Sequence, residues 1–216
     1  MSTTCTPEAR ITRSLLGYGV IAGPFYVTVS LVQAFTREGF DLSRHAWSLL
    51  SNGDLGWIQI TNFVLTGLMV VATAVGLRRA LGPGRGRVWA PLLVGAYGVS
   101  LIGAGVFSAD PAPGFPSGSA AATTMSWHGM LHFVVGGLGF LCLIAACFVL
   151  ASRFARDARN GLAWFSRATG VAFLAGFVGI ASGSQGPTVL AFVTAVLVVW
   201  AWMSTASVTF YRAAAA

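Results

Sequence analysis

The chain has 216 residues, of which 56% are hydrophobic and 9% are charged, and its formal net charge is +7. So few charges exclude a soluble globular domain, because roughly a quarter of the residues of such a domain are charged and cover its surface. The positive charge does not indicate a nucleic-acid partner, since the arginines fall in short clusters between long apolar stretches, a pattern that sets membrane topology.

Six apolar stretches have the length of about 20 residues that a helix needs to cross the hydrocarbon core. They are Leu15–Phe35, Trp57–Leu77, Val88–Ser108, Trp127–Leu150, Trp164–Ser182 and Thr188–Val208. The pattern predicts an all-α membrane protein, with a single bundle of six transmembrane helices over residues 13–210 and short tails at residues 1–12 and 211–216. The first stretch is too long for a signal-peptide core, so we expect it to be retained.

Arginine placement predicts which connections face the cytoplasm. Eleven of the 13 basic residues lie in the tails or in and beside the second and fourth connections, whereas only Arg37 and Arg44 lie in the others. Cytoplasmic connections are the ones enriched in basic residues. We therefore expect a multi-pass protein of the plasma membrane with its N and C termini in the cytoplasm and its first, third and fifth connections outside.

The first outer connection, residues 36–56, contains a predicted short helix. Ser43 is a suitable N-cap and Asn52-Gly53 is a typical helix end, so the helix is predicted to run from Ser43 through Ser51. Because apolar and polar side chains are mixed along it, we expect this short helix to lie in the membrane interface.

Several short motifs lie on the outer side of the predicted bundle. They are His45-Ala46-Trp47-Ser48-Leu49-Leu50-Ser51-Asn52-Gly53, Gly56-Trp57-Ile58-Gln59, Asn62-Phe63, Gly105-Val106-Phe107, Asp110-Pro111, Phe115-Pro116, His128-Gly129 and Leu131-His132. With them the chain resembles the DUF998 family of small multi-pass prokaryotic membrane proteins over roughly residues 12–210. The resemblance implies about six helices. It implies no reaction, substrate or cofactor, because the family has no established function.

The outer face gathers most of the side chains that are suited to chemistry. His128 and His132 are spaced four residues apart and share one face of the fourth predicted helix. Asp110 ends the third helix, Asp54 precedes the second, and His45 lies in the first outer connection. We expect these five side chains to converge in one outward-facing pocket.

This set of side chains suggests a specific chemistry. His128, His132 and Asp110 are residue types that bind divalent metal ions, so the sequence predicts them as ligands of a metal cofactor. If the protein is an enzyme, which the sequence leaves open, it would hydrolyse a lipid-like substrate. The same three residues would then act as ligands or bases, with His45 and Asp54 completing the catalytic site.

Further polar residues are expected to line the pocket. Gln59, Asn62 and Thr66 share one face of the second predicted helix, and Ser48 follows His45 in the first outer connection. Polar side chains within a membrane span are costly and are suspected of function by default. The expected ligand is a small or amphipathic lipid-like molecule, and membrane lipids are the expected surrounding partners.

The alternative is a non-enzymatic membrane scaffold, sensor or transport-accessory protein. In this interpretation the histidines and Asp110 cap helices or bond to backbone carbonyls, and Asp54 is a charge favoured near a helix start. The 27 glycines are explained by close packing of membrane helices. Convergence of the histidine and aspartate side chains would favour a site, whereas dispersion would favour the structural alternative.

Overall fold

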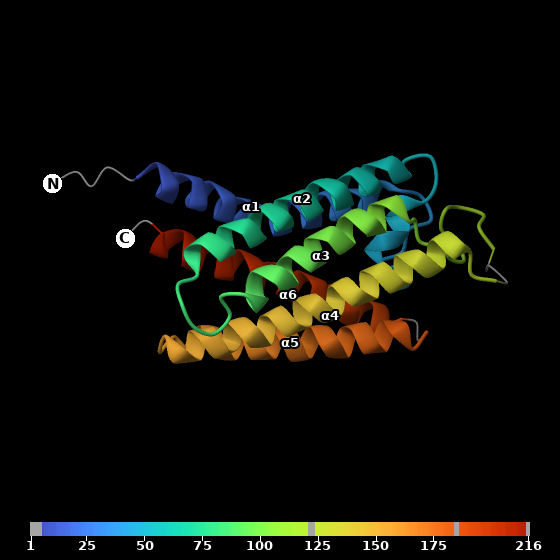
Figure 1. Ribbon diagram of the computed structural model, residues 1–216. Coiled ribbons are helices and arrows are strands. Elements are labelled where there is room, and N and C mark those ends of the chain that lie inside the picture. Colours follow the sequence, from blue (N-terminus) through green and yellow to red (C-terminus); the bar gives the residue numbers. More distant parts are fainter. Residues whose placement is uncertain (1–5, 121–123, 184–185, 215–216) are drawn as a thin grey trace.

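The computed structural model describes residues 6–120, 124–183 and 186–214, and helices dominate this part of the chain. The long helices are α1 (Pro7–Thr36), α2 (Gly56–Ala80), α3 (Trp89–Val106), α4 (Trp127–Arg156), α5 (Asn160–Ala181) and α6 (Pro187–Ala213), as seen in Figure 1. Each of the six is long and apolar enough to cross a membrane. The predicted all-α fold with six spans is therefore confirmed.

Local sequence signals fix several helix starts. The Thr6 hydroxyl accepts a hydrogen bond from the backbone N–H of Ala9, and a proline occupies the first turn of α1. The Ser126 hydroxyl accepts from the N–H of Gly129 at 3.0 Å and caps α4. These caps satisfy N–H groups that lack a partner in the first helical turn. The helices α1 and α4 are longer than predicted because their polar inner ends continue as helix beyond the apolar core.

The six long helices form a ring in chain order, since each packs against the next and α6 closes against α1. Both termini lie at the same end of the bundle in Figure 1, as an even number of crossings requires. We call the opposite end, which carries the 37–55 and 107–126 connections, the outer end. Large apolar side chains such as Phe35, Val99 and Leu138 point away from the ring and are exposed, as lipid contact requires.

The first outer connection folds into the mouth of the ring. Its short helix, η1 (Trp47–Ser51), begins four residues later than predicted, because Ser43 hydrogen-bonds the Asp41 carboxylate through its N–H and hydroxyl and does not cap a helix. Trp47 is only 4% exposed. The short helix predicted in this loop is present, but its buried indole plugs the outer end of the bundle.

Small residues decide how closely neighbouring helices approach. Near the middle of α5 the helix lies on α4, where a Cβ added at Gly170 would be 3.2 Å from the Cβ of Cys147. Toward the outer end, α4 follows α3 through the contact of Gly139 with Ser100, while α5 follows α6 through Gly176. The outer ends of α4 and α5 therefore diverge, as Figure 1 shows.

Candidate functional site

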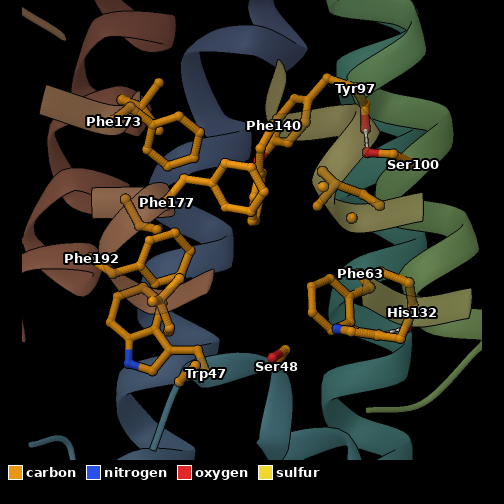
Figure 2. Close-up of a pocket in the computed structure, with 18 of the residues that line it drawn as sticks. Trp47, Ser48, Phe63, Tyr97, Ser100, His132, Phe140, Phe173, Phe177 and Phe192 are labelled. Atoms are coloured by element: carbon orange, nitrogen blue, oxygen red, sulfur yellow. Dashed lines mark hydrogen bonds between the residues drawn. The ribbon is translucent and has the colours of Figure 1, made fainter. Parts of the chain in front are cut away.

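A cavity of about 160 Å³ lies inside the outer half of the ring. All six long helices and η1 contribute aromatic rings to its wall, and Figure 2 shows most of them. The rings are those of Tyr26, Trp47, Phe63, Tyr97, Phe133, Phe140, Phe173, Phe177, Phe192 and Trp200. The volume is close to that of an engineered protein cavity of about 150 Å³ that holds benzene, so one ring or a short alkyl segment fits.

Phe140 organises the wall on the side of α5 and α6. Its ring centroid lies 5.2 Å from that of Phe173, 5.4 Å from that of Phe177 and 5.6 Å from that of Phe192. Edge-to-face and tilted pairs at these separations contribute roughly 0.5–1.5 kcal/mol each beyond their burial. The wall is thus held by ring contacts from three helices.

The cavity reaches the lipid-facing surface between α4 and α5. On the α4 side it is lined by Phe133, which is 51% exposed, and by Gly136 and Gly137. On the α5 side it is lined by the half-buried side chains of Phe177 and Ile180. Because the two helices diverge here and glycine has no side chain, this is the side on which the cavity opens toward lipid. The opening is partly covered by the Phe177 ring, whose Cζ a Cβ at Gly137 would meet at 3.3 Å.

Polar atoms gather at the outer end of this cavity, where Figure 2 places His132 and Ser48. His132 Nδ1 lies 2.7 Å from the carbonyl oxygen of Phe107 and 3.2 Å from that of Ala104. Both partners are acceptors, so the assigned tautomer has the proton on Nδ1. The other ring nitrogen points toward the cavity in Figure 2.

His45 has a structural environment away from this cavity end. It is 3% exposed, and its Nδ1 accepts a hydrogen bond from the backbone N–H of Asp41 at 3.0 Å. Its Nε2 donates to the carbonyl oxygen of Pro113 at 3.1 Å. The imidazole therefore joins the first and second outer connections and has both nitrogens occupied by backbone groups.

Asp110 and His128 also lie outside the cavity. The carboxylate of Asp110 accepts hydrogen bonds from the backbone N–H and the hydroxyl of Ser126, which fixes the loop to the start of α4. The exposed ring of His128 lies against that of Trp127, with centroids 3.7 Å apart and ring planes tilted by 42°. Of the predicted histidines and aspartates, His132 lines the cavity and the others do not.

The predicted convergence of five side chains is thus not seen. Within residues 6–120, 124–183 and 186–214, no three His, Cys, Asp or Glu side chains lie close enough together to hold a metal ion. Asp54 is exposed at the bundle rim. The catalytic role assigned to these residues, and the metal assigned to His128, His132 and Asp110, stay predictions.

The polar residues of α2 pack against α1 and are not among the cavity-lining residues. Gln59 is fully buried, and its Oε1 accepts hydrogen bonds from Gln33 Nε2 at 2.8 Å and from Asn62 Nδ2 at 3.2 Å. The Thr66 hydroxyl donates to Asn62 Oδ1 at 3.3 Å. Hydrogen bonds of this kind between helices stabilise membrane bundles. Ser48, by contrast, is among the cavity-lining residues.

Replacing Gln59 with leucine is expected to lower the stability of the bundle by roughly 1–2 kcal/mol. The change leaves the amide donors of Gln33 and Asn62 without their shared acceptor in an apolar surrounding. Unfolding of the purified protein by SDS titration would measure the loss. The control is Thr205→Val, since that exposed hydroxyl bonds only to its own helix at Ala201 and should cost little. Equal stability of the two variants would contradict the structural role of Gln59.

Arg37, one of the two arginines on the outer side, clamps the first outer connection. Its guanidinium donates to the carbonyl oxygens of Leu50 and Asn52 and lies 4.8 Å above the centroid of the Phe115 ring. Burial lowers the pKa of Arg37, and the nearby Asp54 carboxylate opposes this shift. No local pattern predicts this role, because the partners of a lone arginine in a loop cannot be identified from the neighbouring residues.

The aromatic lining of the cavity was also missed by sequence reasoning. Its ten rings come from seven separate elements, so no spacing within one helix marks them as a group. The one available signal was the number of phenylalanines, 15 in the chain. Single aromatic residues in a span are equally typical of lipid-facing positions.

Comparison with known protein families assigns this six-helix chain to a family. A family model described as "Protein of unknown function (DUF998)" matches residues 20–209, which include nearly all of the helical bundle. The chain belongs to the DUF998 family. The resemblance drawn from the outer-side motifs is thereby confirmed. Neither the curated proteins nor the solved structures gave a match. The DUF998 description assigns no activity, so the cavity is the feature of this DUF998 protein that bears on its function.

Proposed function

We propose that this protein binds an amphipathic molecule from the membrane and holds its apolar part in the aromatic cavity. The observation that supports this proposal is the cavity's position inside the ring, on whose α4 and α5 side the half-exposed ring of Phe133 belongs both to the cavity wall and to the lipid-facing surface. Transfer from lipid gives little hydrophobic gain, because lipid tails are already apolar. Affinity would instead come from packing against a ring-lined wall whose contacts are already formed.

Binding fits the side chains better than hydrolysis does. A hydrolytic site needs a base and a second polar group within reach of one reacting atom. His132 lies at the cavity, but two of the sequence-based candidates for such a partner, His45 and Asp110, are occupied by backbone groups and Ser126. A membrane protein that carries, senses or presents a lipid-like ligand therefore agrees best with the geometry.

Photolabelling tests the proposal directly. The protein would be placed in phosphatidylcholine nanodiscs with dodecan-1-ol that bears a diazirine near its chain end. We expect adducts on Phe173, which is 1% exposed and reachable only from within the cavity. Adducts on Leu138, which is 60% exposed, report contact with bulk lipid and serve as the control. Labelling of Leu138 without labelling of Phe173 would refute the proposal.

We further infer from arginine placement that the termini are cytoplasmic and that the cavity lies toward the outer leaflet of the plasma membrane. Ser117 and Pro83 are exposed at opposite ends of the bundle and are suitable sites for single cysteines. A maleimide that does not cross membranes should label Ser117→Cys in intact cells and label Pro83→Cys only after lysis. The reverse pattern would overturn the orientation. The unsubstituted protein controls for labelling of its own cysteines.

A further inference from the structure

We infer that the ligand of the aromatic cavity carries a hydroxyl group, which donates a hydrogen bond to Nε2 of His132. This inference rests on the proposed function and names the polar end of the bound molecule. The ligand class is thus a neutral lipid-like alcohol, such as a long-chain alcohol or an acylglycerol with a free hydroxyl.

The neighbours of the His132 imidazole decide which of its nitrogens carries the proton. Ala104 lies in the last turn of α3 and Phe107 is its C-cap residue, and carbonyls at a helix end lack partners within the helix. Both bind Nδ1, and a carbonyl accepts hydrogen bonds only, so Nδ1 is held as the donor. In the neutral ring Nε2 then carries a lone pair and is an acceptor.

The other nitrogen of the ring, Nε2, has no partner in the described structure. Among the residues that the structure describes, no hydrogen bond to Nε2 of His132 is found, and Figure 2 shows this nitrogen directed into the cavity. A hydrogen-bond acceptor without a partner in an apolar surrounding is unfavourable. A ligand with an O–H group relieves this cost, whereas an ether or an ester carbonyl does not, because it offers no proton.

The hydroxyl group of Ser48 lies at the same end of the cavity as His132. In the described part of the chain this hydroxyl has no hydrogen-bond partner, although the backbone carbonyl of Ser48 accepts from Ser51. A serine hydroxyl can donate to the oxygen of a ligand. The acceptor of His132 and the donor of Ser48 together match an alcohol group.

The lack of charged side chains among the described cavity-lining residues excludes charged ligands. Among the described residues that line the cavity, none is Asp, Glu, Lys or Arg. A phosphate, carboxylate or ammonium group placed beside the rings would have no counter-charge, and burying an unpaired ion is strongly unfavourable. A neutral hydroxyl can bond to His132 and Ser48 without this cost.

Competition against the photolabel tests the inference. Dodecan-1-ol and 1-methoxyundecane have the same number of heavy atoms, but only the alcohol has a proton to donate. We expect the alcohol to prevent labelling of Phe173 at about tenfold lower concentration than the ether, which corresponds to about 1.4 kcal/mol. The variant His132→Asn should remove this preference, because its side-chain amide can still donate to the Phe107 carbonyl but presents no acceptor at the position of Nε2.

The outcomes separate the two proposals. Equal competition by alcohol and ether would overturn the hydroxyl inference and leave cavity binding in place, whereas no labelling of Phe173 by any probe would refute cavity binding itself. If His132→Asn does not fold, ¹⁵N NMR of histidine-labelled wild-type protein replaces it. Titration with the alcohol should then shift the Nε2 resonance of His132 while the ether leaves it in place, and equal shifts would overturn the inference.

Discussion

The variant Gly136→Phe is expected to abolish ligand binding in the cavity while the bundle stays folded. Gly136 lines the cavity beside the opening between α4 and α5, and a Cβ added there meets nothing within 4 Å. A benzyl side chain at this position would take up much of the 160 Å³ that the ligand needs. Labelling of Phe173 by the diazirine probe should fall at least about tenfold, equivalent to about 1.4 kcal/mol or more.

Gly17→Phe is the matched control for this experiment. Gly17 also lies in a membrane span, and its added Cβ likewise meets nothing within 4 Å, but it does not line the cavity. Its labelling should equal that of the wild type, and SDS titration should show that both variants remain folded. Undiminished labelling of Phe173 in a folded Gly136→Phe variant would exclude the cavity as the binding place.

The second large effect is expected at the contact of α2 with α3, where Gly67→Val should destabilise the bundle by roughly 3 kcal/mol. A Cβ at Gly67 would lie 2.6 Å from the carbonyl oxygen of Gly98 and 3.1 Å from the backbone N of Ile102. Backbone atoms within a helix cannot turn aside as a side chain can, so the two helices must separate along this contact. SDS titration or thermal aggregation of purified protein would measure the loss.

Gly95→Ala provides the comparison within the same pair of helices. Its added Cβ would meet only the Cβ of Ala74, at 3.4 Å, which is close to ordinary van der Waals contact. We expect this variant to stay within about 0.5 kcal/mol of the wild type, as is usual for substitutions that disturb no special feature. A similar loss in both variants would mean that glycine is favoured along α3 for a reason other than close approach.

The sequence predicted the spans well because hydropathy is a local property. A stretch such as Trp57–Leu77 needs no knowledge of its neighbours to be identified as a span, and the structure places α2 at Gly56–Ala80. The start of the short helix in the first outer connection was predicted less accurately. At Ser43 the sequence suggested a cap, but the Asp41 carboxylate competes for the same hydroxyl and N–H, so η1 begins at Trp47.

The residues chosen from the sequence as site candidates lie in different places. His132 and Ser48 line the aromatic cavity, while Gln59 faces α1 and His45 bonds to the Pro113 carbonyl. Which way a polar side chain points depends on the partner that reaches it first. Those partners come from segments far away in the sequence, so spacing along one helix does not reveal them.

Composition and hydropathy along the chain are enough to establish hydrocarbon as the solvent of this protein and to locate its six spans, because both depend on neighbouring residues. The family resemblance likewise comes from short local motifs. The cavity, and the place of the His132 imidazole in its wall, become known from the packing of the helices. The physical reason is that the cavity depends on distances between helices, and small contacts such as Gly139 on Ser100 and Gly176 on Ala195 draw α4 and α5 toward different neighbours.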